Sequence, residues 1–312
     1  MSSTTVALSG GVGGAKLLWG LQMVLPENSL ISVINTGDDD VFFGLNVSPD
    51  LDTAMYTLAN LSNTNQGWGL NDESFNCLSM LEGYSQETWF NLGDKDLATH
   101  LLRTMYLSNG QTLTDVTKML VEQLKIPSTI LPITNDSLAT SLVTSHGKLS
   151  MQEYFVKNRT NPIVKQIKYE HVGTVTLANE ARSGLLNATN IIICPSNPLL
   201  SIAPMLSIPE CSSILKTRKN QVTVISPLIG GKAFNGPAAK LMKQAGLEST
   251  VLGLAEFYQD IAGTLVIDPE DREWQPAIEK LGLSVKILPI TMACADQKIL
   301  LANSILKEIT NE

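Results

Sequence analysis

Hydrophobic residues in this chain fall into short runs that alternate with stretches of helical periodicity. A first apolar run spans residues 5–9, several glycines follow it, and the pattern then predicts an apolar helix from about 15 to 25. A second run at 30–36 is rich in isoleucine and valine, which favour β-strands. Strand and helix patterns that alternate in this order are typical of βαβ units and a parallel sheet.

The same alternation returns in the last third of the chain. The predicted strands there lie at 190–195, 221–226, 263–268 and 284–290, and the predicted helices lie near 236–245, 274–281 and 295–308. The two ends of the chain are therefore expected to build one α/β domain, with a Rossmann-like, mainly parallel sheet and helices on both faces. We assign residues 1–60 and 171–312 to this nucleotide-binding domain.

The middle of the chain, residues 61–170, has a different pattern. Hydrophobic residues recur at every fourth position over 97–105 and again over 116–124, which predicts helices. One hairpin is predicted to turn at 146–147. We interpret this range as a smaller, mostly helical inserted lobe that covers the active site at the edge of the sheet.

Composition and charge narrow the class of protein. Hydrophobic residues make up 44% of the 312 residues and charged residues 17%, which is ordinary for a globular protein. The formal net charge is -8 without any lysine or arginine run, which argues against a nucleic-acid-binding protein. No apolar run approaches the ~20 residues that span a bilayer, and the start lacks the basic leader of a signal peptide. The four cysteines are widely spaced, which indicates reduced thiols and a cytoplasmic protein without membrane partners.

A glycine-rich segment follows the first predicted strand. It contains Gly11, Gly13, Gly14 and Lys16 within the sequence SGGVGGAK. Glycines let a backbone approach a phosphate closely, and the following helix offers free N–H groups at its start. The segment is neither a P-loop nor a complete G-x-G-x-x-G fingerprint, because Lys16 stands where the third glycine belongs. We predict a phosphate-binding loop here, and the alternative is a tight strand–helix turn without a ligand.

Carboxylates are concentrated after the second predicted strand, at 35–40 and 48–53. Hard oxygen ligands near a phosphate-binding loop suggest Mg²⁺, with Asp38 and Asp52 as the candidate ligands. A dehydrogenase would instead use Asp38 to bind a ribose hydroxyl. A third interpretation is a solvated acidic loop in which Asp50 or Asp52 caps the next helix.

Two further loops follow predicted strands and combine prolines with small polar residues. The candidates for binding a base or phosphate in these loops are Ser196, Asn197, Ser226, Gly230 and Gly231. Because the carboxyl ends of parallel strands share one edge of the sheet, we expect these loops to lie near the glycine-rich segment. Ordinary turns are the alternative for each loop taken alone.

The segment 92–100 contains Lys95, a candidate donor to an anionic or carbonyl group, and His100. A single histidine is more often structural than catalytic, and we interpret His100 in that way. The sequence contains no G-x-S-x-G elbow, no H-E-x-x-H motif and no cysteine–histidine nucleophile pattern. Glycines, carboxylates and a few lysines favour phosphoryl transfer, in which catalysis is mostly positioning and charge neutralisation.

Taken together, these segments resemble the 2-phospho-L-lactate transferase family. The resemblance runs in order from about residue 5 to residue 268, through SGGVGGAKLLWGL, NTGDDD, SPDLDTAMYTLA, LGDKDLATHLLRT, QEYFV, PSNPLLSI and SPLIGGKAFNGPA. It implies transfer of a phosphorylated hydroxy or enol acid from a guanosine diphosphate conjugate to the ribityl hydroxyl of the deazaflavin Fo. GMP leaves, Mg²⁺ is required, the product belongs to coenzyme F-420 biosynthesis, and the enzyme is often a homodimer.

The resemblance also implies roles for individual residues. Asp52, in PDLDT, matches the family aspartate that contacts Fo, and Lys95 occupies the position where many relatives have arginine in LGDRD. Both are candidate catalytic residues, and Asp52 would orient or deprotonate the attacking hydroxyl in an in-line displacement. The glycine-rich segment, PSNP and SPLIGG would hold the guanosine diphosphate.

Two other functions stay open at this point. One is a non-enzymatic Rossmann protein that binds a nucleotide sugar and regulates metabolism or cell shape. The other is an NAD-dependent oxidoreductase, which rests on the incomplete glycine fingerprint and on Asp38. The sequence also leaves open whether the transferred acid is phospholactate, phosphoenolpyruvate or 3-phosphoglycerate.

Overall fold

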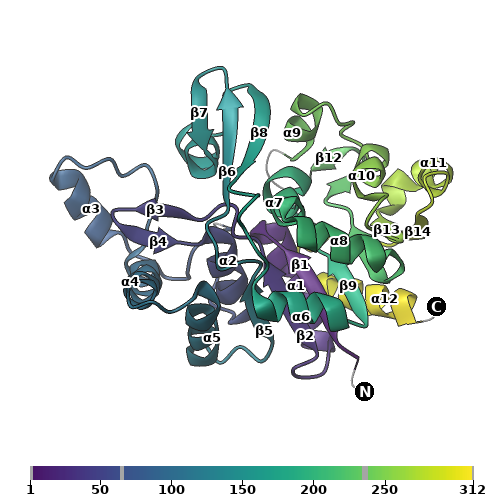
Figure 1. The fold of residues 1–312 in the computed structure, drawn as a ribbon, viewed down its shortest axis with the longest axis horizontal. Helices are drawn as coiled ribbons and strands as arrows, with labels where there is room; N and C mark the ends of the chain where they lie inside the picture. The colour runs from purple at the N-terminus through teal and green to yellow at the C-terminus, as the bar shows by residue number, and fades with distance from the viewer. Residues whose placement is uncertain (1–2, 64–66, 234–237, 311–312) are drawn as a thin grey trace.

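The computed structural model describes residues 3–63, 67–233 and 238–310, and it has a seven-stranded parallel sheet at its centre (Figure 1). Its strands are β1 (Thr5–Ser9), β2 (Leu30–Ile34), β5 (Thr129–Pro132), β9 (Asn190–Ile193), β10 (Val222–Ile225), β13 (Thr264–Ile267) and β14 (Ser284–Ile287). Every neighbouring pair in this sheet is parallel. The predicted Rossmann-like α/β fold is confirmed, and six of these strands begin and end within three residues of their predicted limits.

The strand order is β14-β13-β10-β9-β1-β2-β5. The chain builds the sheet outward from β1 through β2 to β5, and it then returns to the other side of β1 with β9. Strand order therefore reverses between β1 and β9. The loops that leave these two strands face each other across the crevice where open α/β sheets bind their ligands.

Helices cover both faces of the sheet, as predicted. Alternate residues of β1 point to opposite faces, so Val6 and Leu8 belong to one hydrophobic core and Ala7 to the other. The first core is covered by α6 (Asn179–Asn187), α8 (Pro209–Thr217), α9 (Ala238–Gln244), α10 (Val251–Tyr258) and α11 (Gln275–Glu279). The second is covered by α1 (Gly11–Val24), α2 (Pro49–Leu58), α5 (Leu113–Gln123) and α12 (Ala295–Thr310).

The range 61–170 is not one continuous insertion. Helices α3 (Asn76–Gly83) and α4 (Asp94–Ser108) project beside the hairpin of β3 (Asp40–Phe42) and β4 (Leu45–Val47), but α5 and β5 return to the main sheet. The short run TILP of β5 was not predicted as a strand, because four apolar residues between helical patterns carry little periodic signal.

A second projection is an antiparallel sheet of order β7-β6-β8, formed by β6 (Ala139–Thr144), β7 (Gly147–Ser150) and β8 (Val164–Glu170). The predicted hairpin at 146–147 is confirmed, and Gly147 adopts φ +102° in its turn. The remaining elements are short: α7 (Ala203–Ser207), β11 (Leu228–Ile229), β12 (Lys232–Ala233), and helical turns at Glu153–Lys157, Pro198–Ile202, Lys219–Gln221 and Pro269–Trp274.

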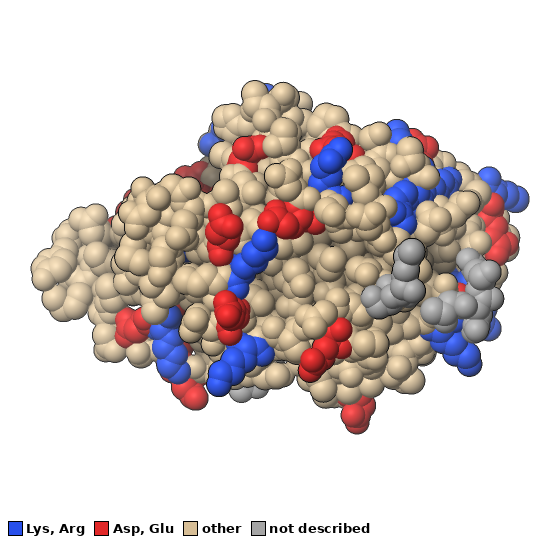
Figure 2. All heavy atoms as spheres, turned by 60° about the horizontal axis from the view of Figure 1, so that its bottom comes forward, with Lys and Arg blue, Asp and Glu red and all other residues tan. Residues whose placement is uncertain are grey.

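The surface carries few charged clusters on the face shown in Figure 2, where lysine and arginine are scattered among aspartate and glutamate. Within the described residues, no single helix has the length and hydropathy of a membrane span. One pair of helices, 198–207 and 209–217, meets that requirement only together and is bent by 93°.

Two helical glycines differ in the space around them, and this difference can be tested. A Cβ added at Gly20 would lie 2.4 Å from the carbonyl oxygen of Lys298, because α1 and α12 pack closely. A Cβ added at Gly184 would meet Ile31 and Val6 at an ordinary 3.6 Å. We expect Gly20→Ala to lower the free energy of unfolding by about 1–3 kcal/mol. Gly184→Ala, the matched control, should raise it by about 0.4–1 kcal/mol.

Urea denaturation of both variants measures these changes. A Gly20→Ala protein as stable as the wild type would show that the two helices can separate without cost.

Candidate active site

The loops after β1 and β9 are joined by hydrogen bonds at the point where strand order reverses. The backbone N–H of Gly10 donates to Ser196 Oγ at 3.1 Å. The N–H of Gly11, the first residue of α1, donates to Asp50 Oδ1 at 2.6 Å. The glycine-rich segment therefore forms the first turn of α1, which begins four residues earlier than predicted. Ser196 of the β9 loop and Asp50 of α2 meet at this turn.

Close packing explains why glycines are required here. A Cβ added at Gly13 would lie 2.6 Å from the carbonyl oxygen of Pro195. At Gly14 it would lie 2.2 Å from Ser9 Oγ and 2.5 Å from Ser196 Oγ. Real Cβ atoms do not approach that closely, so any other residue would push the β1 and β9 loops apart. The segment is thus a tightly packed junction whatever it binds.

Lys16 lies one turn further along α1 and half-buried, on the side that packs against α12. Burial lowers the pKa of Lys298 on α12, and the positive charge of Lys16 lowers it further. Lys298 also lies over the ring of Trp19, 5.0 Å from its centroid. The structure therefore places Lys16 beside a second lysine, which gives this end of α1 a local positive charge.

Three buried carboxylates gather beside the start of α1. Asp38 is 3% exposed and Asp50 is 7% exposed, and Asn35 Nδ2 donates to Asp50 Oδ2 at 2.9 Å. Burial raises the pKa of Asp50 to about 6. Burial and then the charge of Asp50 raise the pKa of Asp38 well above its usual range. Burial likewise raises the pKa of Asp39, whose Oδ1 has no hydrogen-bond partner among the described residues.

The second projection is tied to this acidic loop. Gln152 Nε2, from the QEYFV segment, donates to the carbonyl oxygen of Asp38 at 3.2 Å. Ser150 Oγ, at the end of β7, donates to Asp40 Oδ2 at 3.1 Å. The antiparallel sheet of β6, β7 and β8 is thereby held over the carboxyl edge of the main sheet.

Asp52 forms a two-pronged ion pair with Arg103 of α4. Arg103 Nη1 donates to Asp52 Oδ2 at 3.1 Å, and Nη2 donates to Oδ1. Asp52 is 5% exposed and Arg103 is 1% exposed. Burial alone would lower the pKa of Arg103, but Asp52, together with Tyr56 and Asp39, raises it overall. Both oxygens of Asp52 are therefore held in one orientation by a fully charged guanidinium.

A second set of ionisable groups adjoins this pair. His100, also 1% exposed, places Nδ1 3.7 Å from Asp52 Oδ2 and Nε2 3.3 Å from Asp96 Oδ2. Tyr56 donates its hydroxyl hydrogen to Asp96 Oδ1 at 2.6 Å. Burial would raise the pKa of Asp96, but His100, together with Tyr56 and Arg103, lowers it overall. Residues of α2 and α4 thus form a continuous buried polar network.

Two groups of side chains have the chemistry to hold a metal ion. Ligand atoms of Asp52, Asp96 and His100 lie within 4.8 Å of one another, which is close enough for one ion. However, the guanidinium of Arg103 is already hydrogen-bonded to Asp52. In addition, Mg²⁺ prefers oxygen ligands and keeps several waters. Asp38 and Asp50 fit Mg²⁺ better, because no lysine or arginine within the described ranges is hydrogen-bonded to their oxygens.

Lys95 is not hydrogen-bonded to Asp52 in the part of the chain that the structure describes. It is exposed in the first turn of α4, and its Nζ donates to the carbonyl oxygen of Asn71 at 2.8 Å. The preceding residue, Asp94, accepts hydrogen bonds from Ser74, Asn76 and Cys77 and so caps α3. The LGDKD segment therefore joins α3 to α4, and the cation that contacts Asp52 comes from Arg103, two turns later.

Asn197 and Ser226, in the last two loops, are hydrogen-bonded within their own loops. Asn197 Oδ1 accepts from the N–H groups of Leu199 and Leu200, and the Ser226 hydroxyl bonds the backbone of Leu228. Gly230 and Gly231 form the two-residue turn between β11 and β12, at φ +55° and +70°, which glycine adopts readily. Phe234 to Pro237, at the end of this segment, lie outside the described residues.

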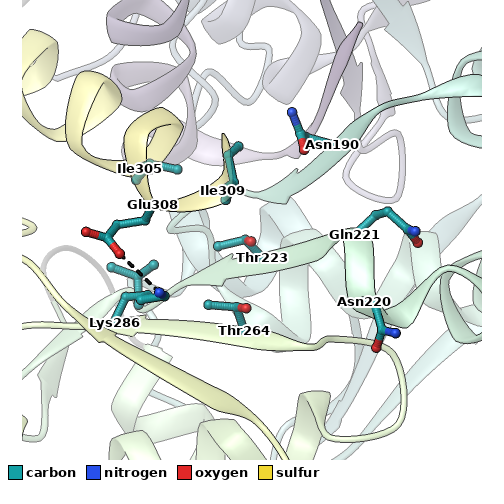
Figure 3. Close-up of a pocket in the computed structure, with 10 residues that line it drawn as sticks. Asn190, Asn220, Gln221, Thr223, Thr264, Lys286, Ile305, Glu308 and Ile309 are labelled. Atoms are coloured by element: carbon teal, nitrogen blue, oxygen red, sulfur yellow. Dashed lines mark ion pairs between the residues drawn. The ribbon is translucent and has the colours of Figure 1, made fainter. Parts of the chain in front are cut away.

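A cavity of about 130 Å³ lies at the opposite edge of the sheet (Figure 3). It is lined by residues at the amino ends of the strands, such as Asn190 and Thr264, and by the last turns of α12. An ion pair of 3.1 Å between Lys286 and Glu308 crosses one side. Since it contains none of the predicted site residues, we place the active site at the carboxyl edge instead.

Arg103 and Asp50 were not predicted as site residues. Arg103 lies three residues after His100 in LATHLLRT, and this spacing places both side chains on one helical face. The feature of the sequence that could have identified Arg103 as a site residue is its position among hydrophobic residues. Its partner could not be identified from sequence, since Asp52 lies 51 residues earlier.

Comparisons with known proteins identify the family of this chain. Residues 5–288 match the sequence model of the family described as 2-phospho-L-lactate transferase CofD. The chain is 35% identical over 277 residues to a 2-phospho-L-lactate transferase of Methanosarcina mazei, covering 89% of this chain and 91% of the relative. It is 33% identical over 308 residues to a phosphoenolpyruvate transferase of Streptomyces griseus, covering 97% of each.

A solved structure supports the fold. A Bacillus halodurans protein of the UPF0052 family superposes with a TM-score of 0.60 at 14% identity, covering 98% of this chain and 99% of that one. The family model matches nearly the whole chain. This match and the similar relatives establish the family to which the chain belongs. This chain belongs to the 2-phospho-L-lactate transferase family.

Proposed function

We propose that the protein transfers a phosphorylated hydroxy or enol acid from its guanosine diphosphate conjugate to the ribityl hydroxyl of Fo. GMP is released, and the product is a precursor of coenzyme F-420. The observation that carries this proposal is Asp52, the aspartate of PDLDT, held buried and oriented two residues after Asp50, which contacts the glycine-rich turn. A nucleotide-binding regulator would not require this oriented carboxylate beside its phosphate site.

The guanosine diphosphate half would bind where strand order reverses. The start of α1 supplies Gly11, Gly13 and Gly14, and its N–H groups and helix dipole favour a phosphate. Lys16 adds a positive charge one turn along. The loop residues proposed to line the nucleotide are Ser196, Asn197, Ser226, Gly230 and Gly231.

For Mg²⁺ we propose Asp38 as a ligand, with Asp50 beside it. Burial and mutual repulsion make the ionised forms of both carboxylates costly, and a divalent cation would relieve that cost. A bound Mg²⁺ would neutralise charge on the phosphate groups. Asp52 was the second predicted ligand. Since Arg103 occupies it, we assign Asp52 to the acceptor.

The reaction is an in-line displacement at phosphorus. The ribityl oxygen of Fo forms a bond to the phosphorus that bears the acid, and the bond from that phosphorus to the GMP oxygen breaks. Asp52 accepts a hydrogen bond from the ribityl hydroxyl and receives its proton as the new bond forms. Backbone N–H groups at the start of α1 stabilise the charge that develops on GMP. Lys95 would add positive charge from the first turn of α4.

A homodimer is the assembly we propose. Helix α3 buries none of its residues, and α4 exposes Leu101 and Met105. Met80 and Tyr84, 56% and 68% exposed, extend this apolar surface along α3 and its end. Exposed apolar surfaces of this kind mark contacts with other proteins, and sedimentation velocity measures the assembly directly.

Purified protein mixed with Fo, Mg²⁺ and each of the three guanylylated acids tests the function. We expect GMP and a phosphodiester of Fo with one donor, identified by mass spectrometry. The relatives named for phospholactate and phosphoenolpyruvate are about equally similar, so the assay also identifies the acid. A folded protein that binds guanosine diphosphate but forms no product with any donor would favour the regulator.

Asp52→Asn removes the carboxylate charge while keeping the size of the side chain. We expect turnover to fall by about 10²–10⁴-fold, the range for loss of a general base. Circular dichroism should show an intact fold. Asp136→Asn is the control, because Asp136 is exposed and its carboxylate accepts hydrogen bonds from Thr176, which is not one of the proposed site residues. An Asp52→Asn enzyme with near-normal turnover would contradict the role assigned to Asp52.

Metal binding should depend on pH through Asp38 and Asp50. The pKa of Asp50 is about 6 in the folded protein, above the unfolded value of 3.8. Its contribution to stability is therefore present below about pH 4 and is lost as pH rises through about 6. Mg²⁺ binds the ionised form, so it should raise the melting temperature more at about pH 7.5 than at about pH 5.

Asp38→Asn should lose most of this response to Mg²⁺, whereas Asp136→Asn should keep it. An equal rise in melting temperature at both pH values would rule out Asp38 and Asp50 as the ligands.

A further inference from the structure

We propose that Arg103 is a positioning residue that acts on the acceptor through Asp52. This inference rests on the proposed transfer to Fo. Arg103 itself is 1% exposed, so it does not reach a substrate directly. Its two terminal nitrogens instead bind the two oxygens of Asp52 and fix the plane of the carboxylate.

The guanidinium fork takes up only part of the hydrogen-bonding capacity of Asp52. A carboxylate offers about four lone-pair positions, and the guanidinium fork occupies two of them in one plane. The remaining positions are the ones available to a ribityl hydroxyl. Because α2 and α4 each carry one partner, the direction of these lone pairs is set by the packing of two helices.

The guanidinium has further neighbours, and the negative charges of Tyr56 and Asp39 add to that of Asp52 in raising its pKa. Besides Asp52, Nη1 lies 3.3 Å from His100 Nδ1 and 3.4 Å from the carbonyl oxygen of Asn46, at the end of the β3–β4 hairpin. Nε is buried and has no hydrogen-bond partner. The arginine is thus anchored to α2, α4 and the hairpin, all of which border the acidic loop.

This arrangement is costly if it serves stability alone. Burying an ion pair is often no better for stability than burying two apolar side chains. The unpartnered Nε adds a desolvation cost. A role in orienting Asp52 accounts for both features, because an apolar pair could not hold a carboxylate in one plane.

Lysine is the informative replacement, because it keeps the positive charge but loses the two-pronged geometry. We expect Arg103→Lys to lower kcat by about 10–100-fold, as a misplaced catalytic group does. The KM for the guanylylated donor should stay within about twofold, since the donor site lies at the start of α1. Circular dichroism and the melting temperature establish that the variant is folded.

A double-mutant cycle separates positioning from general destabilisation. If Arg103 acts through Asp52, adding Arg103→Lys to Asp52→Asn should cause no further loss of kcat. If Asp52→Asn is too slow to measure, the same cycle is run on Fo affinity by calorimetry. Arg218→Lys is the matched control. Arg218 binds the carbonyl oxygens of Leu186 and Ala188, which lie before the amino end of β9 and so at the edge of the sheet opposite the site, and turnover should be unchanged.

The outcomes are distinct. No activity in the wild type would overturn the proposed function. An active wild type with normal kcat in Arg103→Lys would overturn this inference alone, and so would losses that multiply across the cycle. Should Arg103→Lys fail to fold, Asp52→Asn/Arg103→Met removes both charges together. That variant should match Asp52→Asn in kcat, and a further loss in the folded protein would overturn the positioning role.

Discussion

Negative charge buried at the carboxyl edge of the sheet is the constraint on which the rest of the site depends. Asp38, Asp50 and Asp52 are each less than a tenth exposed, and Asp39 lies among them. Burying ionised carboxylates is expensive unless cations or hydrogen bonds balance them. Arg103 balances Asp52, whereas Asn35 and the amide of Gly11 stabilise Asp50 only in part. A divalent cation bound at this edge would offset the remaining negative charge and, in the transfer that we propose, the charge of the phosphate-bearing substrate.

The glycine-rich turn and the acidic loop are two sides of one junction. Gly11 donates to Asp50, and Gly14 lies against Ser196, so the first turn of α1 contacts both the acidic helix α2 and the β9 loop. A substrate phosphate that approaches α1 would therefore meet carboxylates already in place. This proximity is the physical reason to expect the metal, the nucleotide and the acceptor within a single crevice.

The two projections are each tied to the acidic segments at this edge of the sheet. Gln152 ties the three-stranded sheet to the backbone of Asp38, and Arg103 ties α4 to Asp52. Each projection thus contacts the acidic loop through one buried polar side chain. The exposed apolar residues of α3 and α4 lie on the outside of the same unit.

The amino-acid sequence by itself determined the elements and most of the motifs. Alternating apolar runs identified β1, β2 and the last four strands of the seven-stranded sheet. The aspartate of PDLDT was identified from its sequence segment. These features are local, since they depend on residues a few positions apart. Only the tertiary structure decided the strand order, the return of β5 to the main sheet, and the pairing of Asp52 with Arg103 rather than Lys95. Such contacts join residues that are far apart in the chain. They are brought together by the packing of helices, which cannot be predicted from local sequence patterns.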